Sequence, residues 1–420
     1  MSAYSEDLLH GAPEISGGSI GRLIALISCI AIFILTAFFG VRGGYSVLAI
    51  ITFCVMLILW RHSQQSLGIV LIFSAMTLYV VPFVSLIYVD LPVTLAVFAL
   101  FSMTAYVMVN VGQSVERHSP PFDPSYSSER NLLIMVALLV LGLVATPFVG
   151  DFGQPLFTGF AAVALVHLER AHWGQGSKIT RWVCLVIYAV AICIYAALFW
   201  DGFGRIVIIS LLLLPIIVSV RYRLFHLSPL VLAGAGGAMV FIGRVLRFGF
   251  SEGIAGISED SGATHIILSS ELLANHARNT SGTTLLQQFE LFFLNWAPRS
   301  IWPGKPININ SLFVDSYLGR AGYSEEHSTA LGFFGEQIYL APAFWLLTVP
   351  IAIAMALAVR ALIGRLAQPY YSSVVIYDVW LVTLFWGGMA SFAARAWFTV
   401  IPLVIYVIFL KYREALPRSE

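Results

Sequence analysis

Three prolines and a tryptophan surround two cations in PRSIWPGKP, residues 298–306 of a chain that is otherwise mostly apolar. An arginine fork contacts two phosphate oxygens at once, and a lysine supplies a compact point charge. The prolines restrict the backbone that carries these side chains. Arg299 and Lys305, with Trp302 between them, therefore suggest a binding site for an anionic head group.

Four further arginines border apolar runs or follow them closely: Arg205, Arg244, Arg247 and Arg395. For any single one, the simpler explanation is a side chain that reaches lipid phosphates from the end of a membrane span. In the topology described below, however, three separate parts of the chain bring cations to one depth. The set as a whole predicts an outer basic pocket that suits a lipid-linked pyrophosphate.

Two candidate proton acceptors follow in HSTALGFFGEQIYLAP, namely His327 and Glu336. Either could take the proton from a reacting hydroxyl. The alternatives are a solvated loop histidine and a carboxylate that stabilises the N-terminus of its own helix. No cluster of His, Asp or Glu has metal-ligand spacing, so we expect no metal and no other cofactor. The four cysteines lie in apolar runs, which argues against disulfides.

These residues must be positioned by membrane helices. The chain has 420 residues, of which 59% are hydrophobic and only 11% are charged. Long apolar runs predict an all-α polytopic membrane protein, because about 20 apolar residues cross a bilayer as a helix. Twelve spans are predicted, at 21–40, 45–60, 67–89, 92–111, 132–150, 155–168, 182–200, 205–220, 229–243, 334–359, 373–390 and 397–410.

The bias of Lys and Arg toward cytoplasmic loops predicts that both termini are cytoplasmic. Residues 1–243 then hold spans one to nine, 244–333 form a large outer loop, and 334–420 hold the last three spans. Long loops are usually functional. Two helices are predicted inside this one, at 266–278 and 283–296, and PRSIWPGKP follows the second.

The sequence resembles the O-antigen polymerase family of bacterial oligosaccharide repeat-unit polymerases. The resemblance rests on PRSIWPGKP, on LGFFGE at 331–336, on GFGR at 202–205 and on Arg395, and so covers roughly 201–395. One departure is YLAPA at 339–343, where the family often has glycines shortly after the glutamate.

The resemblance implies a GT-C-like glycosyltransferase architecture in the bacterial cytoplasmic (inner) membrane, with the active site facing the periplasm. The expected reaction, part of lipopolysaccharide or other polysaccharide biosynthesis, transfers a glycan from undecaprenyl pyrophosphate to a lipid-linked acceptor sugar. Arg205, Arg299, Lys305 and Arg395 would stabilise the leaving pyrophosphate. The expected partners are lipid-linked oligosaccharides, membrane lipid and a separate chain-length regulator, with no nucleic acid.

Two other functions fit the same hydropathy. An O-antigen ligase uses the same donor but transfers the glycan to lipid A core. A flippase or transporter for lipid-linked sugars would also have about a dozen spans, with charges near the bilayer midplane and repeated halves. Asp378 is the main charge inside the predicted spans, and no internal repeat is visible, so the polymerase is preferred.

Overall fold

The computed structural model of this chain describes residues 65–80, 91–116, 127–173, 177–199, 205–228, 231–232, 234–236, 238, 284–313 and 331–415. Within these ranges the protein is helical and contains no strand. The predicted spans at 21–40 and 45–60, most of the one at 229–243, and the predicted helix at 266–278 lie outside the described residues.

The helices follow the apolar runs closely. In chain order they are α3 (Ser66–Ala75), the π-helical turn η1 (Met76–Val80), α5 (Leu91–Glu116), α6 (Ser128–Ala145), the 3₁₀ turns η2 (Thr146–Phe148) and η3 (Gly150–Phe152), α7 (Gly153–Trp173), α8 (Lys178–Phe199), α9 (Arg205–Arg221), α14 (Leu285–Leu294), α15 (Ile309–Phe313), α16 (Gly332–Leu340), α17 (Trp345–Ala367) and α18 (Ser372–Ala415).

Four of the described helical segments are long and apolar enough to cross a membrane: Ser128–Phe148, Lys178–Phe199, Trp345–Ala367 and Ser372–Glu414. Large apolar side chains on α6 and α8 point outward, with Leu133 70% exposed and Ile179 74% exposed. Such a surface is unfavourable in water and suits a lipid environment. These features identify a helical membrane protein, and the total of twelve spans stays a prediction.

One predicted span has the wrong bounds, because the apolar helix in this region is Trp345–Ala367. The sequence suggested a continuous helix over 334–359, but α16 ends at Leu340 and α17 begins at Trp345. The cause is Pro342, which disfavours the helical conformation in the residue before it. Ala341 accordingly has φ −140° and ψ 61°. Glu336 therefore lies on a short separate helix and not at the mouth of a span.

The last two predicted spans form a hairpin within α18. The Nε1 of Trp380 donates to the Oγ1 of Thr399 at 2.7 Å, although the two residues are 19 apart in sequence. A straight helix would separate them by about 28 Å. The chain turns back at Gly388, whose φ of 79° and ψ of −171° occur almost only in glycine.

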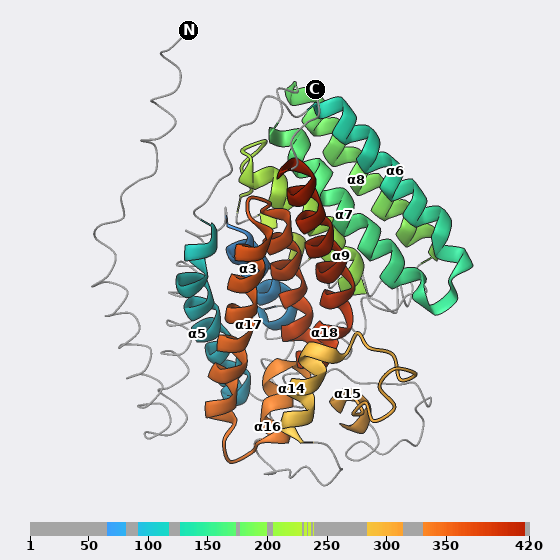
Figure 1. Ribbon diagram of the computed structural model, residues 1–420. Helices are drawn as coiled ribbons and strands as arrows, with labels where there is room; N and C mark the ends of the chain where they lie inside the picture. Colours follow the sequence, from blue (N-terminus) through green and yellow to red (C-terminus); the bar gives the residue numbers. More distant parts are fainter. Residues whose placement is uncertain are drawn as a thin grey trace, which may run out of the picture. The chain divides into compact units, whose positions relative to one another are not determined.

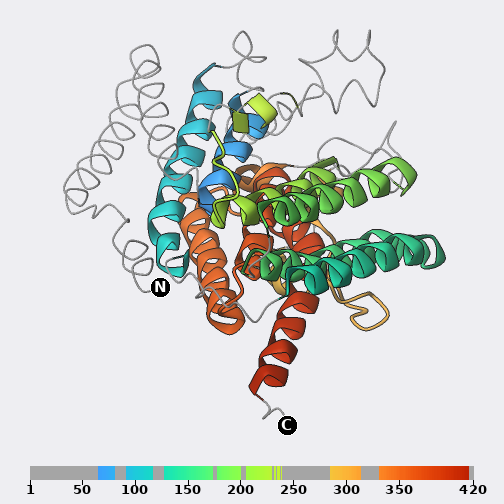
Figure 2. The ribbon, with the colours of Figure 1, turned by 90° about the horizontal axis from the view of Figure 1, so that it is seen from above.

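The α18 hairpin is the centre of the described helices, since α3, α7, α9, α14, α16 and α17 all pack against it. Figure 1 shows α14, α15 and α16 at the end of the hairpin where the chain turns. Helix α7 also packs on α6, and α5 packs on α17 (Figure 2). The helices α14, α15 and α16 thus lie against the turn of this hairpin.

Buried charged groups hold the first half of the hairpin. Arg360 donates to both carboxylate oxygens of Asp378, at 2.6 and 2.8 Å, and to the carbonyl of Gly112 at 2.7 Å. Glu169 accepts from the backbone nitrogens of Tyr371 and Ser372 at 2.7 and 2.8 Å, which caps the start of α18. Because all three groups are hydrogen-bonded within the protein, the cost of burying them is offset, and a purely structural role accounts for them.

Candidate anion-binding site

The predicted basic segment forms a turn that is closed by its own cations. Helix α14 begins at a capping box between Thr284 and Gln287, and ends before Asn295. The ammonium of Lys305 donates to the carbonyl oxygens of Asn295 and Ala297, at 2.6 and 2.9 Å. The Nη1 of Arg299 donates to the carbonyl of Lys305 at 2.8 Å. The two cations therefore stiffen the turn, as the three prolines were expected to do.

The two cations of this turn differ in how exposed their side chains are. Arg299 is exposed, whereas Lys305 is partly buried. Burial lowers the pKa of the Lys305 ammonium, and the nearby Arg299 guanidinium lowers it further. Trp302 is partly buried in the same turn. Arg299 is thus the more available of the two for an external anion, whereas Lys305 mainly holds the turn closed through its two hydrogen bonds.

Hydrogen bonds attach the turn and its neighbours to the α18 hairpin. The Nδ2 of Asn295 donates to the carbonyl of Ala390 at 2.7 Å, and the Nε1 of Trp397 donates to the carbonyl of Phe292 at 2.6 Å. Asn310 of α15 donates to the carbonyl of Gly387 at 2.8 Å and to the Oγ of Ser391 at 3.1 Å. In the part of the chain that the structure describes, neutral side chains therefore attach α14 and α15 to the hairpin.

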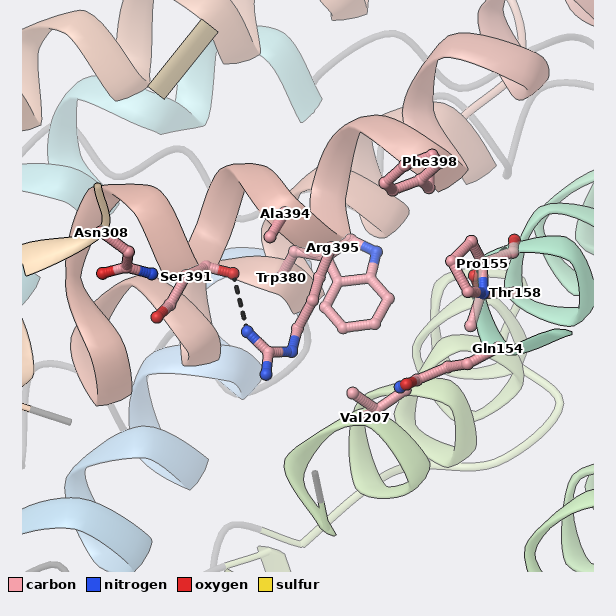
Figure 3. Close-up of a pocket in the computed structure, with 10 residues that line it drawn as sticks. All are labelled: Gln154, Pro155, Thr158, Val207, Asn308, Trp380, Ser391, Ala394, Arg395 and Phe398. Atoms are coloured by element: carbon pink, nitrogen blue, oxygen red, sulfur yellow. Dashed lines mark hydrogen bonds between the residues drawn. The ribbon is translucent and has the colours of Figure 1, made fainter. Parts of the chain in front are cut away.

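A cavity of about 310 Å³ lies beside this junction (Figure 3). Four parts of the chain contribute to it: the start of α7, the start of α9, the segment before α15, and both halves of α18. Its lining consists of Gln154, Pro155, Thr158, Val207, Asn308, Trp380, Ser391, Ala394, Arg395 and Phe398. The volume is at the lower end of the usual range for small-ligand sites, so the cavity suits one head group.

Arg395 is the charged residue among those that line the cavity. Figure 3 shows its guanidinium in the space between α18 and the side chains of Gln154 and Val207. Its Nη1 donates to the carbonyl of Ser391 at 3.0 Å. Among the residues that the structure describes, it forms no ion pair. Most of its N–H donors therefore lack an acceptor among the described residues, and an anion in the cavity could supply one.

Two of the other predicted cations, Arg205 and Lys305, lie close in sequence to residues of the lining. Arg205 is the first residue of α9, two positions before Val207 of the lining. Asn308, also in the lining, follows Lys305 by three residues. Arg244, Arg247 and His327 lie outside the described residues, so their roles stay predictions.

Glu336 occupies a different place from the one expected for a base. It is fully buried, and its Oε2 accepts from the backbone nitrogen of Met389 at 2.8 Å. Its Oε1 has no hydrogen-bond partner among the described residues. Burial raises the pKa of its carboxyl to about 8, against a smaller lowering by the Met389 hydrogen bond. Glu336 is not part of the cavity lining.

Sequence reasoning missed the neutral part of the lining. Gln154, Thr158 and Asn308 are polar but uncharged, and nothing in their spacing marks them. Trp380 and Phe398 belong to apolar runs in which aromatic residues are common. Only their relation to Arg395 in space identifies them, so the sequence held no signal for this group. Among the described residues, no group of three or more His, Cys, Asp or Glu is placed to hold a metal ion.

No family model, curated protein or solved structure matches this chain.

Proposed function

We propose that the protein polymerises undecaprenyl-pyrophosphate-linked oligosaccharide repeat units at the outer face of a bacterial cytoplasmic membrane. The glycan would leave its lipid pyrophosphate and join the sugar of a second lipid-linked unit. This reaction needs a site that binds a lipid-borne anion and accommodates sugar next to it.

The observation that carries the proposal is the guanidinium of Arg395 in a cavity whose described lining has no acidic side chain. A guanidinium without an ion partner attracts an anion, and its planar fork matches two phosphate oxygens. The cavity is formed by helices that contact α18 and by the segment after PRSIWPGKP. An anionic head group carried by a membrane lipid fits such a site.

In the proposed reaction, an acceptor hydroxyl oxygen forms a bond to the anomeric carbon of the donor sugar. The bond from that carbon to the pyrophosphate oxygen breaks, and the electron pair leaves with the lipid pyrophosphate. Arg395 would stabilise the negative charge that develops there. Arg205, which begins α9, is proposed for the same role. The hydroxyl proton passes to a base, for which His327 stays the predicted residue.

The neutral lining suits the sugar next to the pyrophosphate. The carboxamides of Gln154 and Asn308 can both donate to and accept from sugar hydroxyls. Phe398 and Pro155 offer apolar faces against which a sugar ring can pack. This combination of one cation, two carboxamides and apolar walls supports a phosphorylated sugar as the ligand.

The test is incubation of the purified protein with undecaprenyl-pyrophosphate-linked repeat units, followed by a gel of the glycan products. A ladder of increasing length is the expected result. Transfer only to added lipid A core would instead identify a ligase. Translocation of lipid-linked units across vesicles, with no new glycosidic bond, would identify a flippase or transporter, and either outcome would overturn the proposal.

A further inference from the structure

Glu336 is enclosed by protein on all sides and makes one specific hydrogen bond. Its carboxyl accepts from the Met389 nitrogen at 2.8 Å, across 53 residues of sequence. The adjacent residue of α16, Gln337, is also fully buried. Among the described residues no cation pairs with this carboxyl, and burial of an unpaired carboxyl is costly, so its single hydrogen bond needs an explanation.

The partner of Glu336 is the first residue after the turn of the α18 hairpin. The first N–H groups of a helix have no acceptor within that helix, and a side chain from elsewhere can supply one. Met389 directly follows Gly388, where the backbone leaves the helical conformation. The carboxyl of Glu336 therefore caps the second half of α18, in the same way as Glu169 caps the first half.

The fit around this cap is close. A Cβ placed on Gly388 would lie 2.2 Å from the Oε2 of Glu336 and 2.7 Å from its carboxyl carbon. Real Cβ atoms do not approach other atoms so closely, so a glycine is required here for space as well as for its positive φ. The carboxyl and the turn are thus fitted to one another, and a shift of either moves the other.

This turn also determines where the cavity cation lies. Arg395 follows Met389 by six residues, which is about 9 Å along a helix. The carbonyl of Ser391, between the two, accepts from the Arg395 guanidinium. Ser391 and Arg395 both line the cavity (Figure 3). The start of this helix therefore sets the position of the guanidinium.

We propose that Glu336 is a positioning residue: its carboxyl caps the second half of the α18 hairpin and thereby holds Arg395 in the anion-binding cavity. The link to glycan transfer rests on the function proposed above, whereas the link between Glu336 and Arg395 does not. A proton acceptor must reach the substrate, and the fully buried Glu336 is not part of the cavity lining.

Three substitutions separate the two roles. Glu336→Gln keeps the length of the side chain and an oxygen that accepts from Met389, but it cannot act as a base. Glu336→Asp keeps the acid but is one methylene too short to reach the same nitrogen. Glu336→Ala removes the acceptor altogether. A matched control is Glu290→Ala, which removes an exposed carboxylate from α14, another helix that packs on α18.

The first measurement is amide hydrogen exchange of full-length protein in nanodiscs, over the peptide that contains Met389 and Ser391. Loss of one buried hydrogen bond is expected to speed exchange about tenfold or more in Glu336→Ala and Glu336→Asp. Glu336→Gln and Glu290→Ala should exchange like the wild type. Unchanged exchange in both Ala and Asp variants would overturn the proposal, whether or not the protein is a polymerase.

The second measurement is binding of undecaprenyl pyrophosphate, with Arg395→Ala as the reference for a lost cation. The Glu336→Asp and Glu336→Ala variants should bind at least about fivefold more weakly, and Glu336→Gln should bind normally. If Glu336→Ala does not fold, the Gln and Asp variants still decide the question. Normal exchange and binding in Glu336→Gln, together with loss of glycan transfer, would show that Glu336 is an acid or base.

If the wild type binds undecaprenyl pyrophosphate but forms no glycan product, the polymerase proposal fails on its own. The exchange results would then still decide whether Glu336 positions the hairpin. The two proposals therefore fail by different observations.

Discussion

Replacement of Arg395 by alanine is expected to slow glycan transfer by roughly 30- to 1,000-fold while leaving the protein folded. The reason is the position of the guanidinium in the cavity, where it has one hydrogen bond to Ser391 and no ion partner among the described residues. The other N–H donors of Arg395 can bind a ligand. Their removal is therefore expected to weaken binding and catalysis more than folding.

The magnitude follows from the proposed contact of Arg395 with pyrophosphate and from its hydrogen bond to Ser391. Charge-assisted contacts to a leaving pyrophosphate contribute about 2–4 kcal/mol to stabilisation of the transition state. Since about 1.4 kcal/mol corresponds to a tenfold change in rate, the expected loss is roughly 30- to 1,000-fold. The hydrogen bond to Ser391 contributes only about 0.5–1.5 kcal/mol to folding. Catalysis is therefore expected to suffer more than stability.

Arg395→Lys tests the geometry of the contact separately from its charge. A lysine keeps the positive charge but cannot contact two phosphate oxygens as a planar fork. If the fork is required, the lysine variant should lose nearly as much activity as the alanine variant. If the side chain only reaches toward lipid phosphates, the lysine variant should work normally.

The assay is the initial rate of glycan ladder formation by purified variants, measured over a range of donor concentration. Membrane abundance and thermal stability of each variant are measured in parallel. Arg365→Ala is the control, because Arg365 is an exposed arginine on α17 outside the cavity lining. Normal rate and normal donor dependence in Arg395→Ala, at normal abundance, would refute the assignment of the cavity.

Three further predictions follow from other features. Arg299→Lys should lose activity nearly as far as Arg299→Ala if Arg299 grips pyrophosphate, with protein level maintained because the residue is exposed; mild loss in both would leave the turn as an interfacial anchor. The carboxyl of Glu336 has an ordinary pKa of 4.5 and a folded pKa of about 8, so the folded state retains a proton that the unfolded chain releases. Stability of the wild type relative to Glu336→Gln should therefore fall as pH rises from about 4.5 to about 8 and then level off, and parallel melting curves across that range would contradict the burial argument. Glycan transfer is expected to continue in EDTA, and its complete loss with recovery on addition of magnesium or manganese would reveal a metal site.

Hydropathy predicted the helices well, because an apolar run of fixed length has few alternatives in a bilayer. The run at 182–200 became α8, and the predicted loop helix at 283–296 became α14, within a few residues at each end. Hydropathy predicted one continuous helix over 334–359, and this failed because Pro342 interrupts the helix. Proline is an ambiguous signal, however, since α17 and α18 continue through Pro350 and Pro402.

The candidate site was predictable only where it carries charge. A cation beside an apolar run is conspicuous in a sequence, and Arg395 was found in that way. Whether a carboxyl faces a substrate or a backbone nitrogen depends on packing between distant helices, which no local pattern encodes. Glu336 was therefore identified as chemically important, but its contact with Met389 could not be foreseen. The carboxamides of Gln154 and Asn308 carry no charge and stand in no recognisable motif, so the sequence did not mark them as part of the site.

The two carboxyl caps of the α18 hairpin have a consequence for assembly in the cell. Each half of the hairpin begins on an acceptor from elsewhere in the chain: Glu169, which is 202 residues before Tyr371, and Glu336, which is 53 residues before Met389. Both acceptors are synthesised before the hairpin emerges from the ribosome. Until it docks, two carboxyl groups await their backbone partners. A chain that stops short of the hairpin would lack the backbone donors of both groups, although Glu169 would still accept from the hydroxyl of Tyr222 at 2.6 Å. Glu336 is therefore the carboxyl that depends more on the hairpin for its hydrogen bond.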